Sequence, residues 1–118
     1  MVADLNSQGG ELVVAEIAAA GGRAVFQRTD VTSEPDIAAL IDRAVREYGH
    51  LDITYNNAGV LGAVGSIEDV KAADWDRTLA VLARSVFFGI KHSIKPMRNN
   101  GGGSMLGSIR LISERGNR

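Results

Sequence analysis

Residues 51–59 read Leu-Asp-Ile-Thr-Tyr-Asn-Asn-Ala-Gly and run from a strand-like segment into a polar turn. Apolar, β-branched and aromatic residues over 51–55 favour a strand, and the Asn-Asn-Ala-Gly run marks its end. A helical pattern ends at Gly49 before this stretch, and a second helical pattern follows it. Because a strand between two helices is the repeating unit of a parallel sheet, these nine residues decide the fold class.

The same alternation of strands and helices extends in both directions. The expected elements are, in order, a strand stub over 1–3 ending at Asp4, a helix over 12–20, a strand over 24–26, a helix from the Ser33 cap to Gly49, the strand over 51–55, a helix over 74–97 and a strand over 104–112. This order predicts an α/β protein with βαβ units. We expect a partial Rossmann-type, doubly wound parallel sheet in three α/β/α layers.

Composition narrows the range of functions. The 118 residues include 14 glycines, no cysteine, and 13 basic against 14 acidic side chains, for a net charge of −1. This length accommodates a single domain, and a balanced charge argues against a nucleic-acid partner. No apolar run is long enough for a membrane span, and no signal peptide is visible. The lack of cysteine excludes a disulfide framework and fits a cytoplasmic location. The paired glycines are expected at turns between elements.

Polar residues stand just after three of the expected strands. Asp4 ends the first strand, Asp30 follows the second, and Asn57 follows the third. Open parallel sheets bind ligands outside the carboxyl ends of their strands. The residues themselves leave alternatives open, since Asp4 also fits a helix cap or a solvated acid, and Asp30 a turn before the Ser33 helix.

Several motifs resemble the classical short-chain dehydrogenases/reductases. The NNAG run at 56–59 is similar to a motif of this family, and further similarity lies at Asp4-Leu5, Asp30-Val31-Thr32, 75–79 (WDRTL) and 85–89 (SVFFG). The resemblance covers nearly all of the chain in the family's own order. It implies an NAD-dependent oxidoreductase that interconverts an alcohol and a ketone by hydride transfer, with residues 1–118 as part of an NAD(P)-binding Rossmann domain.

The resemblance also implies roles for individual residues. Asp4 would accept hydrogen bonds from the adenosine ribose and repel a 2′-phosphate, which favours NAD over NADP. Asp30 and Val31 would face the adenine, and the 57–59 backbone would line the ribose. The implied cofactor-binding residues are Asp4, Leu5, Asp30, Val31, Asn57, Ala58 and Gly59.

The chain departs from the family's pattern at three places, and these departures limit the function that the resemblance implies. The phosphate-binding TGxxxGxG loop is absent, so we expect weak cofactor binding. The YxxxK pair is absent as well, because Tyr48 and Tyr55 are each followed four residues later by other residue types. Leu82 stands where the family has an asparagine, and Arg110 stands where it has a catalytic serine. No catalytic residue is therefore expected in this chain.

Two functions remain open at this stage. The first is the NAD-dependent enzyme, with a small alcohol or ketone as substrate. The second is a non-catalytic truncated fragment or gene remnant that associates with full-length relatives or with itself through the 74–97 helix. Neither His50 nor His92 has a metal-ligand partner at useful spacing, so no metal site is expected. We also expect Trp75 and Phe87-Phe88 in the core, and an unpaired sheet edge beside Tyr55.

Overall fold

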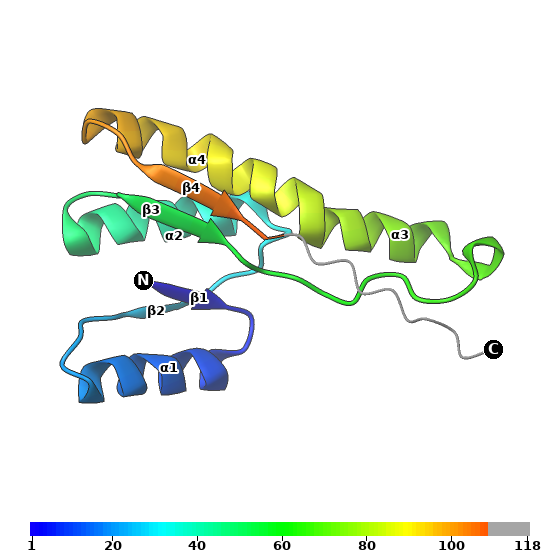
Figure 1. Cartoon of the computed structure of the whole chain (residues 1–118), viewed down its shortest axis with the longest axis horizontal. Helices are drawn as coiled ribbons and strands as arrows, with labels where there is room; N and C mark the ends of the chain where they lie inside the picture. Colours follow the sequence, from blue (N-terminus) through cyan, green and yellow to red (C-terminus); the bar gives the residue numbers. More distant parts are fainter. Residues whose placement is uncertain (109–118) are drawn as a thin grey trace.

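The computed structural model describes residues 1–108, and its helices alternate with parallel strands (Figure 1). The elements are β1 (Val2–Asp4), α1 (Ser7–Ala19), β2 (Phe26–Arg28), α2 (Glu34–Tyr48), β3 (Ile53–Asn56), the 3-10 turn η1 (Ile67–Asp69), α3 (Ala72–Leu79), the π-helical turn η2 (Ala80–Arg84), α4 (Ser85–Asn99) and β4 (Ser104–Gly107). The α/β class is confirmed. Arg110, and the part of the last expected strand beyond residue 108, lie outside the described residues.

The four strands form two separate parallel pairs. β1 pairs with β2, with Val2 opposite Phe26, and β3 pairs with β4, with Ile53 opposite Ser104. Within residues 1–108, β1 and β3 do not pair with each other. The expected free edge beside Tyr55 is therefore present, and it divides the sheet into two halves.

Helices cover the two halves from different sides. α1 packs on β1 and β2, whereas α4 packs on β3 and α2 packs on α4 (Figure 1). The main apolar core lies where α2, α4 and the start of β3 meet. It consists of Ile37, Ile41, Ala44, Leu51, Phe88 and Met97, with Met1, Val31 and Val45 packed against it. No helix within the described residues is long and apolar enough to cross a membrane.

α2 forms where its end signals predict it. The Ser33 hydroxyl accepts a hydrogen bond from the Asp36 N–H at 3.4 Å, and Glu34 and Asp36 place negative charge in the first turn. Gly49 ends the helix in the left-handed region with φ 85°, a conformation that only glycine adopts without strain. Its buried face carries Ile37 and Ile41.

α1 begins five residues earlier than the sequence predicts. The Asn6 side chain accepts a hydrogen bond from the Gly9 N–H at 3.1 Å and caps the helix, so Gly9 and Gly10 lie within it and not in a turn. Gly10 lies against the ring of Phe26, so closely that an added Cβ would overlap the ring. Close packing on β2 therefore requires a glycine at position 10. β2 starts at Phe26, two residues later than expected.

A π-helical turn interrupts the expected 74–97 helix. The Ser85 N–H donates to the Ala80 carbonyl five residues back, and the Ser85 hydroxyl donates to the Val81 carbonyl at 2.5 Å. The extra residue in this turn rotates the following helix face by about 100°. Residues on the two sides of the π turn therefore do not share the faces that one uninterrupted helix over 74–97 would give them.

The aromatic residues of α3 and α4 differ in burial. Phe88 is buried as expected, but Trp75 is 50% exposed and Phe87 is 56% exposed. The expectation that Trp75 and Phe87 belong to the core is wrong, because α3 and the outer face of α4 lie at the surface. Leu82 is buried within the π turn, so the helix is interrupted there without an asparagine.

Replacement of Gly10 by alanine tests the packing of α1 on β2. In an exposed helix this change stabilises a protein by up to about 1 kcal/mol. Here we expect a loss of about 1–3 kcal/mol in the free energy of unfolding, because the new methyl group overlaps Phe26. Urea denaturation of Gly10→Ala beside the exposed-site control Gln8→Ala measures the difference. A Gly10→Ala protein at least as stable as the parent contradicts this packing.

Candidate functional site: a cavity at the strand ends

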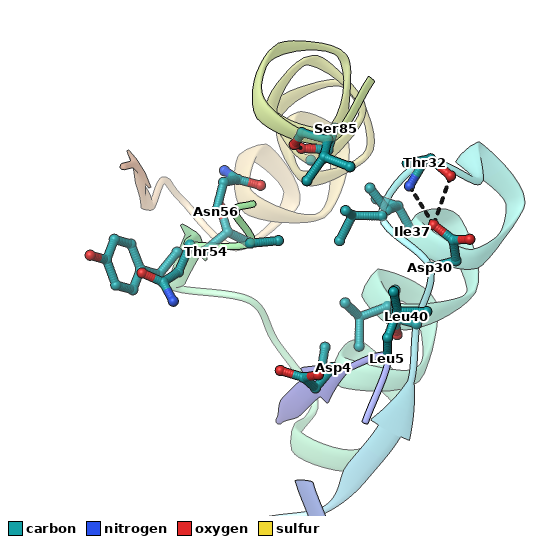
Figure 2. Close-up of a pocket in the computed structure, with 18 of the residues that line it drawn as sticks. Asp4, Leu5, Asp30, Thr32, Ile37, Leu40, Thr54, Asn56 and Ser85 are labelled. Atoms are coloured by element: carbon teal, nitrogen blue, oxygen red, sulfur yellow. Dashed lines mark hydrogen bonds between the residues drawn. The ribbon is translucent and has the colours of Figure 1, made fainter. Parts of the chain in front are cut away.

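A cavity of about 730 Å³ lies between the two halves of the sheet. Its walls come from the ends of β1, β2 and β3, from one side of α2 and from the segment around the π turn (Figure 2). All seven residues that the sequence singles out for cofactor binding line it, namely Asp4, Leu5, Asp30, Val31, Asn57, Ala58 and Gly59. The fold thus brings together residues from three strand ends that are far apart in the sequence.

Asp30 is held in a fixed orientation by its own loop. Its Oδ1 accepts hydrogen bonds from the Thr32 N–H at 2.9 Å and the Thr32 hydroxyl at 2.7 Å (Figure 2). The Asp30 N–H donates to the Asp36 carboxylate at 3.0 Å. The predicted turn role of Asp30 is therefore confirmed. These bonds to Thr32 lower the pKa of the Asp30 carboxyl below its ordinary value, so the side chain acts as a hydrogen-bond acceptor at neutral pH.

Asp4 and Leu5 form the opposite wall of the cavity. The Asp4 carboxylate is exposed, and its Oδ1 accepts a hydrogen bond from the Asn6 N–H at 2.8 Å. Leu5 is 52% exposed. Asn6, not Asp4, caps α1, so the alternative role of Asp4 as the cap is wrong. The Asp4 side chain stands at the cavity rim with a carboxylate that faces solvent.

The segment 57–59 continues from β3 along the cavity as exposed, irregular backbone. A Cβ added at Gly59 would meet Leu82 at 3.8 Å, which is an ordinary contact distance. Packing within the described chain thus leaves room for a side chain at Gly59. The side chain of Asn56, the residue before this segment, donates a hydrogen bond to the Leu106 carbonyl at 3.2 Å and links β3 to β4.

Sequence reasoning missed three polar residues of the cavity wall. Thr32 fixes Asp30, and Arg77 and Arg84 bring positive charge to the same cavity. Arg77 also contributes to the lowered pKa of Asp30. The two arginines are seven residues apart, but the π turn ends at Arg84, so regular helical spacing does not predict that both line one cavity.

Both histidines lie beside carboxylates. His50 Nε2 lies 2.9 Å from the Asp52 carboxylate, and His92 Nε2 lies 2.9 Å from Glu34 Oε1. Lys91 Nζ lies 2.7 Å from the same Glu34 oxygen, so this lysine pairs across α2 and α4. No group of three or more potential metal-ligating side chains occurs within residues 1–108.

Comparison with known proteins gives a consistent set of matches. A family profile described as enoyl-(acyl carrier protein) reductase matches residues 1–117. Cyclohexanol dehydrogenase from Acinetobacter sp. is 32% identical over 94% of this chain and 44% of its own length. A 3-alpha-(or 20-beta)-hydroxysteroid dehydrogenase from Mycobacterium tuberculosis is 39% identical over 87% of this chain and 38% of its own length. The chain thus spans less than half of the curated relatives it matches.

Several solved structures share the fold of this chain. A hydroxysteroid dehydrogenase from Escherichia coli superposes with a TM-score of 0.84 at 37% identity, over 90% of this chain and 44% of that one. An NAD⁺-bound xylitol dehydrogenase gives a TM-score of 0.83 at 29% identity, over 87% and 40% of the two chains. A short-chain type dehydrogenase/reductase from Mycobacterium ulcerans gives 0.83 at 28% identity, over 89% and 39%.

Proposed function

This chain belongs to the short-chain dehydrogenase/reductase family, and we propose that its cavity is the adenosine-binding part of a nicotinamide dinucleotide site. The observation that carries the proposal is the convergence of all seven expected residues on one cavity at the carboxyl ends of parallel strands. Residues 1–118 then form part of an NAD(P)-binding Rossmann domain.

Asp30 is the proposed acceptor for the adenine amino group. Thr32 holds the carboxylate in place, and Asp36 accepts a hydrogen bond from the Asp30 backbone N–H, before any ligand arrives. A pre-oriented, ionised carboxylate binds an amino group without the entropy cost of ordering its own side chain. Val31 is half-buried beside it and offers an apolar surface to the adenine ring.

Asp4 is the proposed partner of the adenosine ribose. Its exposed carboxylate accepts hydrogen bonds from ribose hydroxyls, and its negative charge opposes a phosphate at the 2′ position. We therefore propose NAD, not NADP, as the preferred cofactor. Asn57, Ala58 and Gly59 offer backbone and small side chains along the same cavity, where a ribose can approach closely.

The chain offers more contacts to the adenosine part of the cofactor than to its pyrophosphate. The described residues include no glycine-rich loop at a helix N-terminus for the pyrophosphate, so we propose weak binding, on the order of 1 mM or weaker. The nicotinamide, when bound, donates or accepts the hydride in an alcohol–ketone interconversion. Relatives named for cyclohexanol and hydroxysteroids support a small alcohol or ketone as the substrate class of this family member.

We infer that the 118 residues alone do not catalyse this reaction. A proton donor at the substrate oxygen is needed, and the chain has two tyrosines for that role. The Tyr48 hydroxyl is buried on α2 with no hydrogen-bond partner among residues 1–108, and Tyr55 has no lysine four residues later. The cysteine-free composition supports a cytoplasmic location for the same protein.

A binding experiment tests the proposed site and its preference for NAD. Amide chemical shifts, followed during titration with 5′-AMP and with adenosine 2′,5′-bisphosphate, report where each nucleotide binds. We expect changes at residues 4–6, 30–32 and 57–59, with 5′-AMP binding more tightly. Asp4→Asn should reduce this difference, because it removes the charge that opposes the 2′-phosphate.

The control variant is Asp52→Asn, which removes the same charge from an exposed carboxylate before the start of β3. It should leave the preference unchanged. Saturable binding whose shift changes lie away from the three segments would refute the proposed site. An undiminished preference in Asp4→Asn would refute the role of Asp4.

The alternative function is association with full-length relatives or with a second copy. Its support is a row of partly exposed apolar side chains on α3 and α4, namely Trp75, Leu79, Phe87, Ile90 and Ile94. Exposed apolar surface of this kind is typical of a partner-binding face. We propose that this face, on the helix pair expected at 74–97, is where such a partner would pack.

Co-expression with the hydroxysteroid dehydrogenase from Escherichia coli, followed by size-exclusion chromatography, tests the association. We expect a mixed species that Ile90→Asp and Ile94→Asp each weaken, because a charge would then be buried in the interface. The control Leu12→Asp places the same charge at a 59% exposed position on α1. If no mixed species forms, or if all three variants behave alike, this alternative is wrong.

A further inference from the structure

The turn between α4 and β4 contains a chemically reactive pair of residues. Asn100-Gly101 is the only asparagine–glycine pair in the 118 residues. Asn100 directly follows α4 as its C-cap, and Gly101 takes a positive φ of 88° (Figure 1). Both residues are exposed. The backbone nitrogen of a glycine attacks the preceding side-chain amide more readily than that of other residues, because glycine has no Cβ that keeps the nitrogen at a distance.

This attack converts an asparagine to an acid without an enzyme. The Gly101 nitrogen forms a bond to Cγ of Asn100, the Cγ–Nδ2 bond breaks, and Nδ2 leaves as ammonia with the proton of the Gly101 amide. The product is a cyclic imide. Water then adds to one of the two ring carbonyl carbons and breaks its bond to the ring nitrogen, which leaves aspartate or isoaspartate at position 100. Water is the only co-reactant, and nothing is oxidised or reduced.

Two hydrogen bonds oppose the attack in the folded chain. Nδ2 of Asn100 donates to Asp52 Oδ1 at 3.1 Å, which fixes the orientation of the carboxamide. The Gly101 N–H donates to the Arg98 carbonyl at 3.2 Å, which holds the attacking nitrogen. Both bonds lie at an exposed helix end, where the last turn opens more easily than the helix interior. The reaction therefore proceeds from the opened turn, at a rate that these two bonds limit.

The acidic product is unfavourable at this position. A carboxylate at position 100 cannot donate to Asp52, and it places a second negative charge beside that residue. It also adds negative charge at the C-terminal end of α4, where the helix dipole is already negative. Isoaspartate further lengthens the main chain within the turn that the Gly102 N–H closes on the Met97 carbonyl at 2.9 Å.

Asp52 also accepts the first hydrogen bond of β4. The Ser104 N–H donates to the Asp52 carbonyl at 2.8 Å. Gly103 lies so close to the same carbonyl that an added Cβ would overlap it. The turn thus has little room to shift when Asn100 is altered. Repulsion between position 100 and Asp52 therefore acts on the pairing of β4 with β3.

We propose that Asn100 is a site of spontaneous deamidation, that its contact with Asp52 slows the reaction, and that the acidic product loosens β4 from β3. The reagent is water, so the site needs no modifying enzyme. This inference is independent of the nucleotide site, since none of residues 99–103 lines the cavity.

Mass spectrometry of the intact chain, incubated in mildly alkaline buffer and then digested with trypsin, tests the site. Electron-based fragmentation of the tryptic peptide 99–110 separates Asn99 from Asn100 and aspartate from isoaspartate. We expect the mass gain of an amino group replaced by a hydroxyl group, at Asn100, with isoaspartate present. A synthetic peptide of residues 99–110 is the unfolded reference and should convert about tenfold faster than the intact chain.

Three results of this experiment would overturn the proposal. The first is no mass gain in the intact chain after the synthetic peptide has converted. The second is a gain at Asn99 alone. The third is an equal rate in chain and peptide, because the folded turn would then give no protection.

A pair of variants tests the role of Asp52. Asp52→Ala should accelerate conversion about fivefold, which is the factor that a hydrogen bond of ordinary net strength supplies. The control His50→Gln replaces the residue whose Nε2 lies 2.9 Å from the other Asp52 oxygen, and it leaves the bond to Asn100 in place. It should convert at the parent rate. An unchanged rate in Asp52→Ala, or equal acceleration by both variants, would overturn the role of Asp52.

A second pair of variants tests the effect on β4. Asn100→Asp carries the charge of the product, whereas Asn100→Ser is neutral. We expect the Ser104 amide to exchange its hydrogen about threefold faster in Asn100→Asp than in Asn100→Ser, which is the order of effect of one exposed charge pair. Hydrogen exchange followed by NMR measures both rates. Equal rates would overturn the loosening of β4.

Discussion

The unpaired edges of β1 and β3 are the constraint on which the rest of the structure depends. Backbone N–H and carbonyl groups need partners when they are removed from water, and here each inner strand satisfies only one of its two edges among the described residues. The chain is correspondingly extended, with a radius of gyration of 16.5 Å. A compact domain of this length would have about 13–14 Å. The cavity and the exposed Ile53 and Tyr55 both follow from this divided sheet.

α2 is the element that holds the two halves together. It packs its apolar face into the main core with α4, and its polar side reaches the first half of the chain. Arg43 donates to the Phe26 carbonyl of β2 at 2.9 Å, and Arg23 donates to the Glu47 carbonyl at 3.2 Å. The guanidinium of Arg23 also lies 5.2 Å from the centre of the Tyr48 ring. These contacts hold the two halves together although β1 and β3 do not pair with each other.

The sequence predicts the elements whose signals are local. Ser33 and Gly49 bound α2 because a cap and a left-handed glycine act within one turn of the chain. The start of α1 is not predicted, because the paired Gly9-Gly10 resembles a turn unless the ring of Phe26 is known to lie against Gly10. The exposure of Trp75 is likewise not predicted, since it depends on where α3 lies relative to the rest of the chain.

The candidate site likewise contains some residues that the sequence predicts and others that it does not. Asp4, Asp30 and the 57–59 segment are predictable from their positions after strands, since strand ends of a parallel sheet meet on one side. Arg77 and Arg84 join them only through the packing of α3 and the π turn beside the cavity. The division of the sheet into two pairs was anticipated only as a free edge beside Tyr55, because strand pairing is a long-range property.

Native-state hydrogen exchange of the chain alone tests the central claim most directly, namely that α2 and not a continuous sheet unites the two halves. Amides of β1, β2 and α1 should exchange through one opening with a lower free energy than those of α2, α4, β3 and β4. Arg43→Ala should lower the first value and leave the second unchanged, because it removes the bond from α2 to β2. A single opening free energy shared by all four strands, equally affected by this variant, would contradict the account.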